Sequence, residues 1–231
     1  MDLLLEGVRQ AVGLLLAGDR EVWAILLLSL EVSGSATLVS LAIGIPAGAA
    51  LALARFPGRS LVVSAVNSGM GLPPVVAGLF VTIVLWRSGP LGGLEILYTP
   101  AAIIVAQAAI AAPIVTGITL AAVQGVPVEF RLQLLALGAS RAQMVWVVLR
   151  EARLPMLAAV MAGFGGVISE IGASMMVGGN VKGQTRTLTT AMVLETGKGN
   201  FEVAIALALL LLVLVFLVNW ALTSIQQRRA F

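Results

Sequence analysis

The sequence predicts an all-α integral membrane protein with about five transmembrane helices. Of its 231 residues, 59% are hydrophobic and only 11% are charged, and the mean hydropathy is +1.05. Soluble domains carry about 25% charged residues, so that class is excluded. A span needs roughly 20 apolar residues, and runs of this kind cover 32–54, 60–86, 101–123, the segment from 154 onward, and 203–227. Together they fill most of 1–231, which predicts a single transmembrane domain.

Composition excludes several kinds of chemistry. The chain has no cysteine and no histidine, which excludes disulfides, thiolate or imidazole metal sites and Ser-His catalysis. It has no GxxxxGK[ST] loop, so it does not itself bind and hydrolyse ATP in that manner. The net charge of +3 and the pI near 10.2 reflect basic loops on a membrane protein. No aromatic-basic interleaving of the kind used for nucleic acid is present.

Residues 1–18 are short for a span and carry Asp2, Glu6 and Arg9 among leucines. We expect an interfacial amphipathic helix within an N-terminal segment 1–21, with a sixth span as the alternative. The first span is expected to run from the late twenties to Ala54.

The second span contains Pro73 and Pro74 inside its apolar run. Two prolines remove two helical donors, so a break is expected there. A break at membrane depth persists only where protein or a water-filled cavity satisfies the backbone. A pore-lining kink and a kink that only serves helix packing both remain open.

Basic residues predict the orientation. Placing the 55–59 turn, the 129–153 loop and the C-terminal tail together on the cytoplasmic side puts eight of the 14 Lys and Arg residues there. This agrees in sign with the positive-inside rule. The segments 87–100 and 178–200 are then external.

The segment 129–155 is a polar, basic and amphipathic loop between spans. Residues 140–153, taken as a helix, separate an apolar arc from a polar one. Gly138 just before it suits a tight turn between two short helices, and Pro155 suits a first helical turn. The loop is either solvated on the headgroups or a projecting helical pair that docks a cytoplasmic partner.

Glu170 is the only acid well inside a span, because Glu31 sits at an edge. A buried carboxylate is costly unless it has a partner, a proton or water. Three roles are open: a structural one, such as capping a broken helix or pairing between helices; a gate element; or direct substrate contact.

The Gly138-Ala139-Ser140 motif, followed by a helix and Leu154-Pro155, resembles the coupling loop of ABC-importer permeases. The family consensus for this loop begins Glu-Ala-Ala, and in this chain those three positions are occupied by Leu132, Gln133 and Leu134. The Leu-Pro pair lies four residues further from the glycine than in the consensus. Four residues are close to one helical turn of 3.6 residues, so an added turn could keep the facing of the loop.

The second half is similar to permeases of molybdate, sulfate and tungstate importers, most closely the tungstate type. The similarity lies in 169–180, 182–188 and 194–199, with Leu72-Pro-Pro-Val-Val-Ala-Gly78 in the second span, and covers about 28–225. The resemblance implies a type I importer permease fold and an inner-membrane homodimer that translocates an oxyanion. Its implied partners are two cytoplasmic ATPase subunits, which carry ATP and Mg, and an extracytoplasmic binding protein. No cofactor is expected on this chain.

The expected functional residues form three groups. Those for ATPase coupling are Leu137, Gly138, Ala139, Ser140, Arg141, Leu154 and Pro155. Those for the pathway or gate are Pro73, Pro74, Ser169, Glu170, Gly172, Ser174, Gly178, Gly179 and Asn180. Among them, Ser169, Ser174 and the turn 178–180 supply hydroxyls and backbone amides, which bind oxyanions without a countercharge; the alternative is that the glycines only allow tight turns. Those for docking a binding protein at the external mouth are Lys182, Arg186 and Lys198.

Two other functions compete with the importer permease. A stand-alone secondary carrier is disfavoured, because such carriers display several intramembrane charges and this chain has essentially one. A non-transporting membrane scaffold is the third hypothesis. Copurification with an ATPase subunit separates the first hypothesis from both others.

Overall fold

The computed structural model describes residues 2–16 and 18–228, and the regular elements in these ranges are all helical. In chain order they are α1 (Asp2–Leu16), α2 (Arg20–Leu53), α3 (Arg59–Met70), α4 (Pro74–Leu85), the short 3₁₀ turn η1 (Gly92–Leu94), α5 (Pro100–Gln124), α6 (Val128–Ala136), α7 (Arg141–Glu151), α8 (Arg153–Ile168), α9 (Gly172–Gly178), α10 (Leu188–Gly197) and α11 (Phe201–Arg228). The all-α prediction is confirmed.

Three helices, α2, α5 and α11, are each long and apolar enough to cross a membrane. Two pairs pass the same test jointly, namely α3 with α4, bent by 104°, and α8 with α9, bent by 59°. Counting each bent pair as one span gives five candidate spans in the described residues, as the sequence predicts. The sharper bend falls at Pro73–Pro74, where proline chemistry predicts a break.

The helix that carries the first span begins earlier than the expected span, because α2 runs from Arg20 to Leu53. With 34 residues α2 is about 51 Å long, more than the roughly 30 Å hydrocarbon core, so the expected span start in the late twenties stays a prediction. The Asp19 carboxylate accepts hydrogen bonds from the backbone N–H groups of Glu21 and Val22, at 2.9 and 3.0 Å. An acceptor at this position satisfies donors that a helix start leaves free. The charged residues at 19–21 therefore open α2 instead of closing the N-terminal segment.

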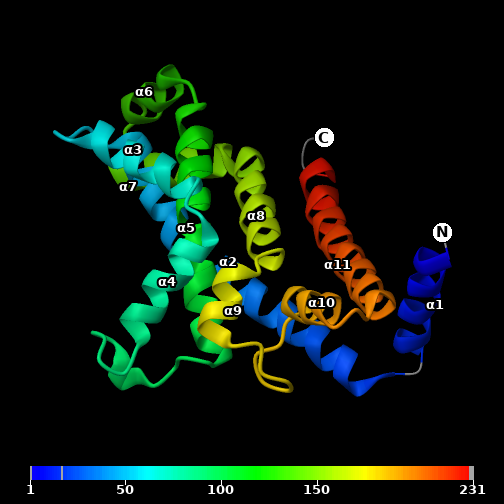
Figure 1. The fold of residues 1–231 in the computed structure, drawn as a ribbon. Coiled ribbons are helices and arrows are strands. Elements are labelled where there is room, and N and C mark those ends of the chain that lie inside the picture. Colours follow the sequence, from blue (N-terminus) through cyan, green and yellow to red (C-terminus); the bar gives the residue numbers. More distant parts are fainter. Residues whose placement is uncertain (1, 17, 229–231) are drawn as a thin grey trace.

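Helix α1 lies beside α11 (Figure 1). Gly7 comes so close to Ile205 that a β-carbon at residue 7 would overlap the isoleucine side chain. With 15 residues, α1 is about 22 Å long, which is shorter than the roughly 30 Å hydrocarbon core of a bilayer. The interfacial helix and the sixth span both remain predictions.

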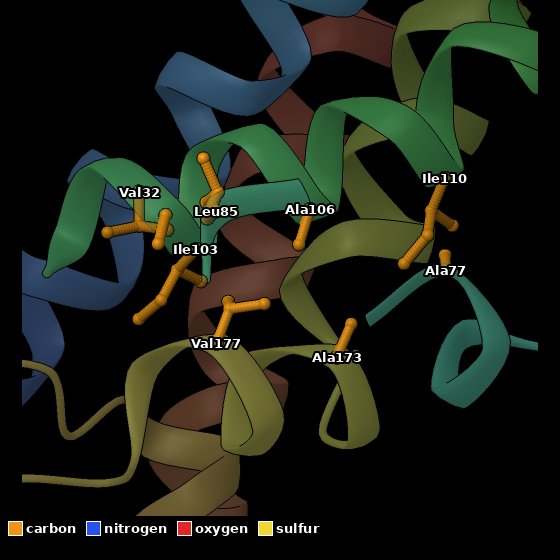
Figure 2. Close-up of a cluster of buried hydrophobic side chains, with 9 residues drawn as sticks. Val32, Ala77, Leu85, Ile103, Ala106, Ile110, Ala173 and Val177 are labelled. Carbon is orange, nitrogen blue, oxygen red and sulfur yellow. The ribbon is translucent and has the colours of Figure 1, made fainter. Parts of the chain in front are cut away.

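The largest apolar cluster lies where α2, α4, α5 and α9 meet (Figure 2). Val32 of α2 and Ile103 of α5 are fully buried in it, and α9 contributes Ala173 and Val177. Small side chains dominate the contact, which lets the helix backbones approach closely. This packing anchors the short helix α9 against α4 and α5, and so fixes the position of both helix breaks.

The three basic segments lie at one end of the molecule (Figure 1). The 55–59 turn, the α6–α7 pair and the last turns of α11 gather there, while 87–100 and the turn between α9 and α10 lie at the opposite end. This arrangement fits the orientation predicted from Lys and Arg. Arg229, part of the basic tail, lies outside the described residues.

The segment 178–200 is not the open loop that the sequence suggests, since it contains α10. Thr187 caps this helix in a capping box with Thr190. Leu188 and Ala191 are buried against Val22 and Ile25 of α2 and against α11. The apolar residues in this short glycine-flanked stretch are thus used for packing.

Candidate functional site

The break between α3 and α4 is built by local chemistry. Gly71 ends α3, Pro73 is the N-cap residue of α4 and Pro74 is its first residue. A proline at this first position costs little, because its missing N–H has no partner in a helix start. The two helices diverge by 104°. The predicted pathway residues Pro73 and Pro74 therefore lie at a bend inside a membrane span.

The break between α8 and α9 is capped by Glu170. Its Oε1 atom accepts the backbone N–H of Ala173 at 2.7 Å, and its Oε2 atom accepts the backbone N–H and the hydroxyl of Ser174, both at 2.9 Å. The side chain is 5% exposed. Three roles were open for this acid, and the structure shows the geometry of the structural one, in which the acid caps a broken helix. A carboxylate at a helix start also complements the helix dipole.

The two breaks touch each other. A β-carbon on Gly172, the first residue of α9, would lie 2.7 Å from Cγ2 of Val75 in the first turn of α4. A β-carbon on Gly78 would lie 2.6 Å from Cα of Ala173. Glycine at both positions therefore permits the close approach. The starts of α4 and α9 form one contact at which a shift in either helix must displace the other.

Gln107 of α5 joins this contact, and sequence reasoning missed it. Its Nε2 atom donates to the backbone carbonyl of Val167 at 3.0 Å and to Oγ of Ser174 at 3.3 Å. Gln107 is 2% exposed. The chain Gln107–Ser174–Glu170 bridges the end of α8 and the start of α9. A signal was available, because Gln107 is the only amide side chain in the apolar run 101–123.

The same break is tied to α10 and α2. The Thr189 hydroxyl donates to the backbone carbonyl of Glu170 at 3.1 Å. The backbone N–H of Leu188 donates to the hydroxyl of Ser29 at 2.8 Å. Groups from α2, α5, α8, α9 and α10 thus form one buried polar network around Glu170. Because buried polar groups need their partners, this network strongly favours a single arrangement of the break.

The remaining predicted pathway residues do not all gather at Glu170. Ser169 is exposed and its hydroxyl donates back to Gly165 at 2.7 Å. Gly178, Gly179 and Asn180 lie at the far end of α9. Gly179 and Asn180 have positive φ angles of 70° and 52°. The structure therefore brings Glu170, Gly172 and Ser174 together and leaves the turn 178–180 apart.

The turn 178–185 is closed mainly by its own hydrogen bonds. Thr185 donates its hydroxyl to the carbonyl of Gly178 at 2.6 Å and accepts the backbone N–H of Val181 at 2.9 Å. The Nδ2 atom of Asn180 lies 3.4 Å from the carbonyl of Thr190. Most of these groups are used within the turn, so the glycines here serve the chain reversal.

The segment 129–155 folds as the expected helical pair. Gly138 has a φ angle of +87° between α6 and α7, which is the tight turn predicted for it. Ser140 caps α7, with a capping box formed with Gln143. Leu137 is 85% exposed at the tip.

The helical pair is fixed to the end of α5. Val148 and Ala152 are buried against Val123 and Val126. Arg131 donates to the carbonyls of Val123 and Val126, at 2.5 and 3.1 Å. Ala152 ends α7 and also precedes α8, so Leu154 and Pro155 lie in the first turn of α8. Any displacement of α7 therefore passes directly into α8 and toward Glu170.

The predicted docking bases are already paired within the chain. Lys182 lies 2.6 Å and Arg186 lies 3.5 Å from the carboxylate of Glu21 in α2, and Lys198 lies 2.7 Å from that of Glu195. Sequence reasoning missed Glu21, because it lies far away along the chain.

Glu195 is held by two donors. Hydrogen bonds from Asn200 and then from Lys198 lower the pKa of Glu195 below its ordinary value. A lowered pKa in the folded chain means that this contact is kept at neutral pH. It is lost as the pH falls through that lowered pKa.

Two broken spans thus meet inside the helical bundle, and a helical pair is fixed at one end of it. Residues 44–231 match the family described as "Binding-protein-dependent transport system inner membrane component". The chain belongs to this family. It is the transmembrane, non-catalytic subunit of an ABC transporter, and the predicted inner-membrane location is confirmed.

Relatives of this chain cover most or all of its length. A "Probable anion ABC transporter permease protein" of Haloferax volcanii is 44% identical over 179 residues, 75% of this chain and 77% of the relative. The "Tungstate uptake system permease protein TupB" of Peptoclostridium acidaminophilum is 37% identical over 227 residues, 98% of this chain and 100% of the relative. The "Molybdenum transport system permease protein ModB" of Escherichia coli is 30% identical over 178 residues, 74% of this chain and 78% of the relative.

Among solved structures, an inward-facing conformation of the MetNI methionine ABC transporter is similar in fold. Its matched chain has a TM-score of 0.73 and 25% identity, with 90% of this chain and 94% of that chain covered. The expected importer-permease fold is confirmed.

Proposed function

We propose that this chain is the translocating subunit of an ABC importer for a tetrahedral oxyanion, and that the anion is tungstate. The observation that carries the proposal is the match to a tungstate uptake permease over 98% of this chain and 100% of the relative. The similarity to a probable anion permease supports the broader substrate class. Molybdate is the second candidate, supported by the more distant match to a molybdenum permease.

The contact between the two helix breaks is the proposed gate. Glu170 is buried and saturated by donors from α9, so its role is to hold the break and not to contact the anion. Val75 and Gly172 lie against each other where α4 and α9 begin. Opening a path between these helices requires this contact to separate, which couples the two broken spans.

The α6–α7 pair is the proposed site of ATPase docking. Leu137 and Ser140 are exposed at its tip, and α7 is continuous with α8 except at Ala152. A partner that displaces α7 would therefore rotate α8 and strain the helix break at Glu170. ATP and Mg would be bound by that partner.

The external bases are proposed to dock an extracytoplasmic binding protein. Lys182, with 66% of its side chain exposed, remains accessible beside Glu21. Surface pairs of this kind are weak, so an acidic partner can exchange with Glu21. Electrostatic steering then speeds association at low salt. The proposed assembly is a homodimer of this chain with two ATPase subunits.

The test is uptake by the reconstituted complex. The chain would be purified with its copurifying ATPase and binding protein, placed in vesicles, and supplied with tungstate, molybdate or sulfate in separate assays. We expect ATP-dependent accumulation of tungstate at a lower external concentration than that needed for molybdate or sulfate. Preferential accumulation of molybdate would show that the transported anion is molybdate and not tungstate. Accumulation without ATP or a copurifying ATPase would favour a secondary carrier.

A further inference from the structure

Helix α3 displays a polar face inside a membrane span. Ser60, Ser64, Asn67 and Ser68 are all exposed. At 3.6 residues per turn these four side chains fall within an arc of about 100°. No charged residue occurs between Arg59 and Arg87. The face therefore consists of neutral hydroxyl and amide groups.

This face points away from α5, the helix on which α3 packs most. A β-carbon on Gly69 would lie 2.9 Å from Pro113 of α5. Gly69 lies about 140–160° from Ser64 and Asn67 around the α3 wheel, and Val66, on the same side as Gly69, lines a recess with Ala109 and Pro113 of α5. The polar groups are thus turned toward whatever lies outside the single chain.

The four side chains also lack hydrogen-bond partners within the part of the chain that the structure describes. Several other hydroxyls in the spans are satisfied by a backbone carbonyl one turn earlier in the same helix. Thr37 donates to the carbonyl of Ser33, and Thr116 donates to that of Ala112, both at 2.7 Å. Unpaired polar groups are strongly disfavoured against lipid tails. The α3 face must therefore meet water or another polar surface.

Asn67 lies one turn before the break at Gly71–Pro73, which adjoins the contact between Val75 and Gly172. The position is therefore next to the proposed gate. Neutral donors suit an anion that must also leave, because conduction requires binding that is favourable but weak. Asn and Ser side chains supply such donors without a countercharge.

We propose that Asn67, together with Ser64 and Ser68, forms a weak hydrogen-bonding site for the translocating oxyanion on a water-filled path beside the gate. This inference rests on the proposed function and names residues that carry its substrate selectivity. Ala65, which lines an apolar recess with Val62 and Val66, lies on a different face of the same helix and supplies the matched control.

The first experiment uses the natural absence of cysteine. Asn67→Cys, Ser64→Cys and Ala65→Cys are each assembled with the partner ATPase and treated with an anionic thiosulfonate reagent in membranes. We expect residues 64 and 67 to react and residue 65 to be inert. Millimolar tungstate should slow the reaction at residue 67. An unreactive residue 67, or equal reaction at 65 and 67, would show that no water-filled path follows this face.

The second experiment measures transport. Asn67→Leu removes the donors and Asn67→Asp places an anion on the path, so each should lower tungstate uptake about tenfold, the value of one hydrogen bond to a charged group. Ala65→Ser should transport tungstate normally, with unchanged ATP hydrolysis in the absence of binding protein. Normal uptake by both Asn67 variants would overturn the inference while leaving the proposed function intact. Failure of the unmutated complex to move any oxyanion would instead overturn the proposed function.

Discussion

Glu170 and Ser174 are joined by two hydrogen bonds, both to the same carboxylate oxygen. Oε2 of Glu170 lies 2.9 Å from the backbone nitrogen of Ser174 and 2.9 Å from its hydroxyl oxygen. The other oxygen, Oε1, accepts from Ala173 at 2.7 Å. This buried acid therefore supplies the acceptors that α9 lacks at its start. Its position at a helix break explains how a carboxylate persists at this depth.

Replacing Glu170 should loosen this break. Glu170→Gln turns one acceptor into a donor that faces N–H groups, so we expect a loss of about 1–3 kcal/mol of stability. Glu170→Ala also removes the cap and should cost at least as much. The measurement is the thermal unfolding of the detergent-solubilised complex, with Glu202→Gln on the exposed start of α11 as control. Equal stability of the Glu170 and Glu202 variants would contradict the capping role.

Gly138 provides the second prediction. Its φ of +87° lies in the left-handed region, which costs residues with a β-carbon roughly 1–2 kcal/mol. Nothing lies within 4 Å of a β-carbon at this position, so Gly138→Val acts on the turn alone. We expect normal insertion but weakened ATPase copurification and loss of transport-linked ATP hydrolysis. Gly58→Val is the matched control, because Gly58 has a φ of +83° with nothing within 4 Å of a β-carbon and lies outside the α6–α7 pair. Full stimulation of the ATPase by Gly138→Val would remove the reason for placing the partner here.

Topology gives the third prediction. A cysteine at Ser140, on the exposed tip of the α6–α7 pair, should resist an impermeant thiol reagent in intact cells. Thr187, which the sequence suggests as the external position, is 4% exposed and caps α10, so it is unsuitable. Gln184 is exposed in the neighbouring turn, and Gln184→Cys should react. The opposite labelling pattern would reverse the orientation.

The pairing of Glu21 with Lys182 and Arg186 gives the fourth prediction. Glu21→Gln frees both bases, so an acidic binding protein should associate faster, most visibly at low salt. Lys182→Gln with Arg186→Gln should slow association, with uptake restored by excess binding protein. Association rates measured at two salt concentrations test both variants. Lack of rescue by excess binding protein would place these bases in the pathway.

Several features followed from local chemistry. The break at Pro73–Pro74 and the turn at Gly138 were predictable, because proline removes donors and glycine tolerates positive φ wherever the chain places them. Apolar run length predicted the number of spans. The start of the helix that carries the first span was not predicted, although Asp19 is a recognisable N-cap residue.

The polar contacts depended on tertiary structure. Gln107 meets Ser174 across 67 residues, and Arg186 meets Glu21 across 165. Nothing local distinguishes these partners from others of the same type, because proximity arises when the helices pack. The same packing buried Thr187 and turned a glycine-rich stretch into α10.

The sequence by itself determined that this protein spans a membrane, where its second span breaks and where its helical pair turns, because hydrophobic length, proline and glycine act through the backbone at their own positions. Only the tertiary structure decided what Glu170 caps, which acid holds the external bases and which face of α3 is left without partners. Those relations depend on which helices lie side by side, and side-chain packing of distant segments sets that arrangement.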